Sequence, residues 1–333
     1  MIYVVVASLS VIVLVLLIVV LGMRPKRARC YDKLHPTRTK IFVSVPSFRD
    51  TACNETINSA FENAANPERI VIGACEQNSV LESESGMRGK NVAFGEIRVI
   101  SIPANQARGP CLARYYCATL YRGEDVYLQI DSHSLFCKDW DLHAVEMLNT
   151  MPYSLDRAVI STHPIDSSIE NWQDYDVPVI TNAKWDGTHL TFQGTFQGKG
   201  FKTARQIGAG FMLCHGSVVD RVPLDPGLAG LFNNEEILYS ARLYTHGIDI
   251  IGPSRNIVAH KYSYEDHKVP WDEKGFSWDA DTGGKRRAER LLLGKLRDPV
   301  YGMGTERSLK RFWRSRKIDF ATKRVKDWQC ASV

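Results

Sequence analysis

From residue 40 onward, apolar runs alternate with amphipathic segments along the chain. The run at 40–46 ends at a proline, a helical pattern covers 52–65, and a second apolar run covers 69–75. A strand, a helix and a strand at this spacing predict a parallel βαβ unit. Further members of the alternation are the strand 97–102, the helix 110–121 and the strand 124–130. The pattern predicts an α/β fold with a mostly parallel central sheet.

The second half of the chain is less regular. Residues 166–200 hold few long apolar runs but several aromatic residues, which predicts an insertion carrying a hairpin. Small residues at 206–210 lead into another strand, where a ligand could approach the backbone closely. A short strand at 257–259 then delivers His260 to a strand end. Helices are predicted at 237–245, 284–296 and 308–316, and the last two are basic.

An apolar stretch at residues 2–23 carries no charged side chain and is long enough to span a bilayer as a helix. A cleaved signal peptide is the alternative, but its basic start and small-residue cleavage site are not clear here. Basic residues follow the span within 24–39, so the positive-inside rule predicts a single-pass protein with a cytoplasmic domain. A Golgi or ER lumenal domain is the alternative. The predicted organisation is an anchor (1–23), a basic linker (24–39) and one domain (40–333).

Composition excludes several classes of protein. The formal net charge of the 333 residues is +5, and much of it lies near the first segment and the C-terminus. This charge distribution is not typical of a nucleic-acid-binding surface. The eight cysteines form no CxxC pair and no compact disulfide framework. We therefore expect a globular domain in which several cysteines are small core residues, and no nucleic-acid partner.

The strongest chemical signal follows the apolar strand 124–130. Asp131 and His133 are separated by one residue, so in extended backbone both side chains point the same way. A carboxylate and an imidazole that converge can share a divalent metal such as Mn²⁺ or Mg²⁺. A capping aspartate beside a solvated histidine is the alternative. A third ligand is needed, and His260 is the candidate.

A second signal precedes the helix at 110–121. Arg108 and Gly109 flank its N-terminus, and Arg114 lies one turn further along. A helix N-terminus beside cations is a favourable anion site, although both arginines could simply be solvated there. A metal site and an anion site at the carboxyl edge of one sheet suit a nucleotide-diphosphate donor, because both stabilise a pyrophosphate leaving group.

Several separated stretches resemble one family. They are IFVSVPSFRD at 41–50, GPCLARY at 109–115, YRGEDVYLQIDSH at 121–133, NEEI at 234–237, ARLYTHG at 241–247 and YGMGT at 301–305. From residue 40 onward the chain is similar to the polypeptide N-acetylglucosaminyltransferases of the GT-A fold, which link N-acetylglucosamine (GlcNAc) to hydroxyproline or threonine. A more distant likeness is to the mucin-type polypeptide GalNAc-transferases, which share the Asp-Ser-His metal motif.

The resemblance implies a UDP-GlcNAc donor, a protein acceptor, a divalent metal and retention of the anomeric configuration. It implies the metal ligands Asp131, His133 and His260, with Asp131 also acting in catalysis. The residues implied to contact the donor nucleotide and sugar are Ser47, Arg49, Asp50, Arg108, Gly109, Arg114, Ala209 and Gly210. Glu235 is implied to hold a sugar hydroxyl, with Glu236 as its competitor and a helix-end acid as the alternative role.

Retention has two general routes. One uses a carboxylate nucleophile, and the other uses front-face attack in which the leaving phosphate takes the acceptor proton. We favour front-face attack, because no carboxylate in the sequence stands out as a nucleophile. The alternatives to an enzyme are a membrane-anchored sugar-nucleotide-binding protein and a scaffold with the same fold. A metal hydrolase is less supported, since the sequence has no HExxH motif.

Overall fold

The computed structural model describes residues 32–79, 95–187, 189–263, 268 and 282–333. The predicted membrane span at residues 2–23 lies outside these ranges. Within them, no helix is both long enough and apolar enough to cross a bilayer. Residues Lys33–Val333 form one compact unit. This unit includes the last residues of the predicted linker, where the backbone of Leu34 exchanges two hydrogen bonds with the amide of Asn149.

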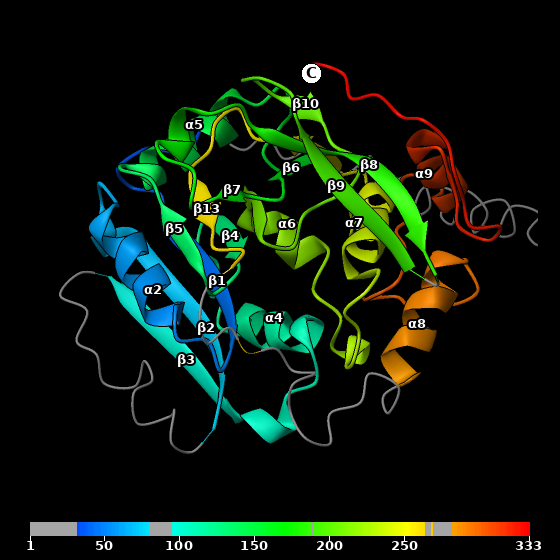
Figure 1. The fold of residues 1–333 in the computed structure, drawn as a ribbon, viewed down its shortest axis with the longest axis horizontal. Helices are drawn as coiled ribbons and strands as arrows, with labels where there is room; N and C mark the ends of the chain where they lie inside the picture. Colours follow the sequence, from blue (N-terminus) through cyan, green and yellow to red (C-terminus); the bar gives the residue numbers. More distant parts are fainter. Residues whose placement is uncertain (1–31, 80–94, 188, 264–267, 269–281) are drawn as a thin grey trace, which may run out of the picture. The chain divides into compact units, whose positions relative to one another are not determined.

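A mixed eight-stranded sheet runs through this unit in the order β10-β12-β6-β11-β4-β1-β2-β3 (Figure 1). Its strands are β1 (Ile41–Phe48), β2 (Ile70–Asn78), β3 (Glu96–Pro103), β4 (Val126–Ile130), β6 (Ala158–Ser161), β10 (Lys202–Thr203), β11 (Phe211–His215) and β12 (Asp249–Gly252). Strands β4, β1, β2 and β3 are mutually parallel, which confirms the predicted βαβ unit. Strand β11 runs antiparallel to β4 and β6.

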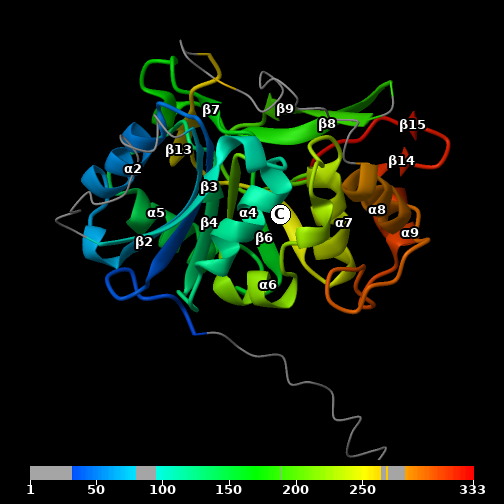
Figure 2. The ribbon, with the colours of Figure 1, turned by 90° about the horizontal axis from the view of Figure 1, so that it is seen from below.

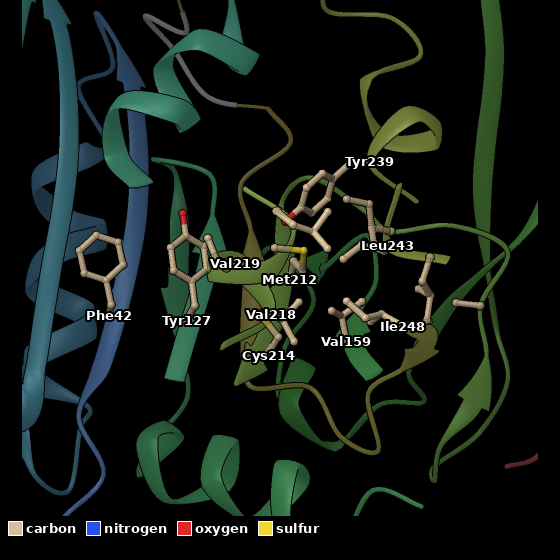
Figure 3. Packing of buried hydrophobic residues seen from close by; sticks show 14 of the residues in the cluster. Phe42, Tyr127, Val159, Met212, Cys214, Val218, Val219, Tyr239, Leu243 and Ile248 are labelled. Atoms are coloured by element: carbon tan, nitrogen blue, oxygen red, sulfur yellow. The ribbon is translucent and has the colours of Figure 1, made fainter. Parts of the chain in front are cut away.

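Helices cover both faces of the sheet. They are α2 (Cys53–Glu62), α4 (Pro110–Thr119), α5 (Trp140–Thr150), α6 (Gly216–Arg221) and α7 (Glu235–Thr245). In Figure 2, α4 lies in front of the sheet and α5 behind it. All five residues of β4 are buried, as expected for a strand with helices on both sides. Tyr127 of β4 stacks on Phe42 of β1 and faces Val218 of α6 and Tyr239 of α7 across one core (Figure 3).

Smaller elements surround the carboxyl ends of the parallel strands. One sheet joins β5 (Ser134–Phe136), β13 (Val258–His260) and β7 (Ile165–Asp166). The predicted insertion forms the antiparallel hairpin of β8 (Pro178–Asp186) and β9 (His189–Phe196), which confirms that prediction. Figure 2 shows this hairpin on the same side of the main sheet as β7 and β13.

Two C-terminal helices, α8 (Thr282–Leu292) and α9 (Leu309–Arg316), pack against α7. The short strands β14 (Ile318–Asp319) and β15 (Arg324–Val325) pair with each other after α9. Leu291, Leu292 and Phe312 are buried in one core with residues of α7. The two basic helices therefore each bury an apolar side, and Arg316 is buried too.

Candidate metal and nucleotide site

Three side chains that are distant in sequence converge at the carboxyl edge of the sheet. Potential ligand atoms of Asp131, His133 and His260 all lie within 4.8 Å of one another. Asp131 follows β4, and a bend places His133 just before β5. Strand β13 pairs with β5 so that His260 lies opposite Ser134, and this pairing brings the third side chain to the other two. The convergence predicted from the sequence is confirmed, although a bend and not extended backbone joins Asp131 to His133.

The imidazole of His133 is held by a carboxylate. Oδ2 of Asp50 lies 2.7 Å from Nδ1 of His133, and it also accepts a 2.5 Å hydrogen bond from the hydroxyl of Ser132. A carboxylate can only accept, so Nδ1 carries the hydrogen and Nε2 of the neutral ring keeps a lone pair. Carboxylates commonly orient metal-binding histidines in this way. Nε2 of His133 is therefore the candidate ligand atom of this ring.

The carboxylate of Asp131 is stabilised in its charged form. Nη2 of Arg114 lies 3.1 Å from its Oδ1, and Nε2 of His260 lies 3.4 Å from its Oδ2. Burial would raise the pKa of Asp131, but the hydrogen bond to His260 and the charge of Arg114 outweigh burial and lower that pKa. Asp131 is thus ionised at neutral pH and can serve as a metal ligand.

The geometry of these residues fits a divalent ion. Two neighbouring ligands of one metal lie about 3 Å apart, close to the 3.4 Å between Asp131 and His260. Nδ1 of His260 is buried and has no hydrogen-bond partner among the described residues. Hydrogen bonds to protein groups therefore do not occupy both nitrogen atoms of this ring. One carboxylate and two imidazoles form an oxygen and nitrogen set suited to Mn²⁺.

Backbone approaches this cluster closely at Gly210, just before β11. A Cβ atom added there would lie 2.9 Å from Oδ2 of Asp131 and 3.4 Å from Pro164. The sequence predicted that small residues at this position allow a ligand to approach the backbone. In the structure, Gly210 also leaves room for the carboxylate of Asp131. Neighbouring Ala209 is fixed by both of its backbone groups, because its carbonyl accepts from Gln129 and its N–H donates to Glu236.

Arg114 connects the metal cluster to α7. Its Nη1 lies 2.7 Å from Oε1 of Glu235, whose Oε2 accepts a 2.9 Å hydrogen bond from the thiol of Cys111. Burial raises the pKa of Glu235 despite the opposing charge of Arg114. Glu236 faces another way and accepts from the N–H of Ala209 at 2.7 Å. The two competing acids therefore have different partners, and only Glu235 is linked through Arg114 to Asp131.

A cavity of about 260 Å³ borders the cluster. Its walls include three of the predicted donor-contacting residues, Asp50, Gly109 and Arg114, together with Asp131 and His133. Gly109 adopts φ +85 at the start of α4, a backbone conformation that favours glycine. The predicted anion site at this helix N-terminus therefore opens into the same cavity as the metal cluster.

Other predicted donor-contacting residues do not line that cavity. Ser47 is 2% exposed, and its carbonyl accepts from the side chain of Gln77. Arg108 is exposed, and its guanidinium donates to the carbonyls of Asn105 and Ala107 in its own loop. Arg49 follows β1 with φ 49, and its N–H donates to the carbonyl of Gln77.

The structure adds residues that sequence reasoning missed. Cys111 bonds Glu235, and the ring of Tyr262 lies 4.2 Å from that of His260. Phe232 and Lys268 line the cavity. No spacing in the sequence indicates these roles. Only the position of Tyr262, two residues after a predicted ligand, could have suggested its contact.

The comparisons with known proteins agree with this geometry. The family model "Glycosyltransferase (GlcNAc)" matches residues 40–91 and 81–322. Because the match covers most of the chain, the protein belongs to this glycosyltransferase family. No curated protein matches the chain.

Solved glycosyltransferase structures share the fold. GalNAc-T7 with UDP, GalNAc and Mn²⁺ is similar over 84% of this chain at 13% identity, with a TM-score of 0.53. This chain spans 55% of the length of that one. TarS 1–349 of S. aureus in complex with UDP-GlcNAc is similar over 83% of this chain and 72% of its own, at 10% identity and a TM-score of 0.53. The α/β architecture with its mostly parallel sheet thus matches that of GT-A glycosyltransferases, as the sequence predicted.

Proposed function

We propose that this protein transfers GlcNAc from UDP-GlcNAc to a hydroxyl group of a protein, with retention of configuration and a divalent metal. The observation that carries the proposal is the Asp131, His133 and His260 cluster beside a cavity that opens on the N-terminus of α4. The family match, the Mn²⁺ and UDP bound by GalNAc-T7 and the UDP-GlcNAc bound by TarS support it. Hydroxyproline and threonine are the acceptor residues that the sequence resemblance favours.

The reaction develops negative charge on the UDP leaving group, and this site offers positively charged groups to stabilise that charge. The bond between C1 of GlcNAc and the β-phosphate oxygen breaks, and its electron pair stays with UDP. A bound divalent ion supplies Lewis-acid stabilisation of that leaving group. The guanidinium of Arg114 and the amides at the start of α4 face the same cavity and add to this stabilisation.

Front-face attack is the route that the side chains support. The acceptor oxygen forms the new bond to C1 while its proton passes to the departing phosphate oxygen. A covalent route needs a free carboxylate near C1. Here Asp131 pairs with Arg114, Glu235 binds Arg114 and Cys111, and Glu236 accepts from Ala209. We assign Glu235 to the sugar pocket, where its remaining lone pairs can accept from a hydroxyl.

The first experiment follows UDP release from UDP-GlcNAc by the purified full chain. Reactions contain Mn²⁺, Mn²⁺ with excess EDTA, or the Asp131→Asn variant with Mn²⁺. We expect release that requires both the metal and Asp131. UDP-GlcNAc binding without release, even with candidate acceptor peptides, would instead support a sugar-nucleotide-binding protein. Absence of binding would contradict the donor assignment.

We further propose that residues 2–23 anchor the protein and that the catalytic unit lies in the cytoplasm. The basic residues that follow the apolar stretch support this orientation. The seven cysteines within the described residues are all free, as expected in a reducing compartment. A protease-sensitive tag after Val333 in intact microsomes tests the orientation, because protection of the tag would place the domain in the lumen.

A further inference from the structure

The hairpin formed by β8 and β9 has one covered edge and one open edge. On the β8 side, the carbonyl of Ile180 accepts from the N–H of Arg205, and the carbonyl of Thr181 accepts from its guanidinium. Strand β9 pairs with β8 alone in the part of the chain that the structure describes. An open strand edge offers a row of unpaired amides and carbonyls to another extended chain.

The register identifies which backbone groups of β9 face outward. The N–H of Leu190 donates to Oδ1 of Asn234 at 2.9 Å, so it points away from β8. Backbone direction alternates along a strand, so Phe192 and Gly194 point outward as well. An independent contact agrees, since Ile180 lies opposite Gly194 and its carbonyl also points out of the hairpin, toward Arg205.

These outward groups are available for pairing. Across the described residues, the backbone N–H and C=O of Phe192 and Gly194 have no partner outside the hairpin. Gly194 is exposed, and the neighbouring Phe196 is 57% exposed despite its large apolar ring. Two successive outward positions on one strand can form a short β-ladder with an incoming chain.

The open edge begins beside the candidate active site. Asn234, which binds Leu190, immediately precedes Glu235, and Glu235 pairs with Arg114. Asn234 also lines a groove of about 790 Å³. Phe232, which is 43% exposed, lines both this groove and the 260 Å³ cavity at the metal cluster. A chain lying along β9 and this groove would therefore reach the donor cavity.

The walls of the groove indicate the side chains that it suits. Trp185 and Phe320 supply apolar surface, and the charged residues are Lys285, Lys323 and Glu289. Two cations against one anion favour acidic over basic side chains in the bound segment. This chemistry fits a polypeptide with apolar and acidic residues.

We propose that the acceptor is bound as an extended polypeptide strand that pairs with the outer edge of β9 through Phe192 and Gly194. This inference rests on the proposed function and names how its acceptor is held. Main-chain pairing would align the segment, and the groove would select the residues beside the acceptor hydroxyl.

The test compares Gly194→Pro with Gly194→Ala in the full chain. Proline removes the outward N–H of residue 194 and blocks pairing there, yet it leaves the hydrogen bonds to β8 intact. Alanine keeps the N–H, and its Cβ would meet only ordinary contacts of 3.4 Å or more. The acceptor probe is a library of peptides, each with one central threonine or hydroxyproline between randomised positions, and UDP-GlcNAc hydrolysis without peptide is measured in parallel.

We expect Gly194→Pro to lower kcat/KM for peptide transfer about tenfold or more, the equivalent of one or two lost hydrogen bonds. Hydrolysis of UDP-GlcNAc by Gly194→Pro and both activities of Gly194→Ala should stay at the native level. Equal peptide transfer by the two variants would overturn the inference, as would hydrolysis with no transfer to any peptide. Absence of hydrolysis in the native protein would contradict the proposed function itself.

A second measurement needs no variant. Backbone N-methylation of the best acceptor peptide, one position at a time, should reduce transfer by the native protein at alternate residues, because only alternate amides face β9 in a ladder. A uniform effect, or an effect at the acceptor residue alone, would also overturn the inference.

Discussion

Oδ2 of Asp50, two residues after β1, lies 2.7 Å from Nδ1 of His133, which follows β4. The contact joins the carboxyl ends of two adjacent parallel strands. It gives Asp50 a role in addition to the nucleotide contact implied by the resemblance, because its carboxylate lines the cavity and also orients a candidate metal ligand. Burial lowers the pKa of His133, but the hydrogen bond to Asp50 and the negative charges of Asp131 and Asp50 together outweigh burial and raise that pKa.

Asp50→Asn should weaken Mn²⁺ binding. An amide at this position can present a donor to Nδ1, so the ring loses its fixed tautomer and orientation. We expect affinity to fall about 10- to 100-fold, as for other carboxylates that orient metal-binding histidines. Titration of free Mn²⁺ by electron paramagnetic resonance measures the change. The control is Asp139→Asn, at a side chain that is 42% exposed, and equal affinity in the two variants would contradict this role for Asp50.

Gly210→Ala should also affect the metal site. The new Cβ would lie 2.9 Å from Oδ2 of Asp131, so that carboxylate must move. An overpacked position typically costs about 1 kcal/mol or more, which corresponds to a loss of Mn²⁺ affinity of about fivefold. Gly194→Ala, which meets ordinary contacts, is the matched control. An unchanged affinity in Gly210→Ala would show that Asp131 does not bind the ion through this oxygen.

Glu235→Gln should reduce donor turnover without removing the metal. The variant keeps the shape of the side chain but replaces its charged contact with Arg114 by a neutral one. A charge-assisted hydrogen bond is worth about 1.5–3 kcal/mol, so we expect kcat/KM for UDP-GlcNAc to fall about 10- to 100-fold. Mn²⁺ affinity should change much less. Glu146→Gln, at a side chain that is 56% exposed, serves as the control.

Arg287→Ala should destabilise the fold. Arg287 of α8 lies 2.7 Å from both Asp225 and Asp298, and the side chain of Asp225 is only 1% exposed. Removing the cation leaves a buried carboxylate unpaired, which costs about 3 kcal/mol. Urea unfolding measures the loss. The exposed neighbour Arg286, changed to alanine, should alter the free energy of unfolding by no more than about 0.5 kcal/mol.

The same ion pair predicts a pH dependence of stability. The hydrogen bond from Arg287, followed by those from the backbone of Tyr301 and Val300, lowers the pKa of Asp298 to about 2. The unfolded value is about 3.9, so this contribution is fully present above about pH 4 and is lost as the pH falls toward 2. Acid unfolding of Arg287→Ala should show a shallower dependence in that window. An identical slope in the native protein would contradict the assignment.

Local sequence determined much of the fold. The apolar strand at 124–130, the proline that starts α4 and the alternation of strands and helices predicted the order of elements and the parallel pairs. These features depend on backbone preferences and on burial patterns within short segments. The sequence did not predict that the sheet contains antiparallel strands as well as parallel ones. The antiparallel placement of β11 between β4 and β6 is a long-range pairing, which local patterns do not determine.

The sequence by itself determined which residues could form the metal site, since Asp131, His133 and His260 each follow or end an apolar strand. Only tertiary structure decided how they are held. The pairing of β13 with β5 sets His260 beside the motif, and β1 brings Asp50 to His133. Tertiary structure also decided that Glu235 pairs with Arg114. It left Arg108 bound to a carbonyl of its own loop and outside the lining of the cavity. Side-chain direction depends on packing between segments far apart in the chain, and the spacing of residues in the sequence does not predict that packing.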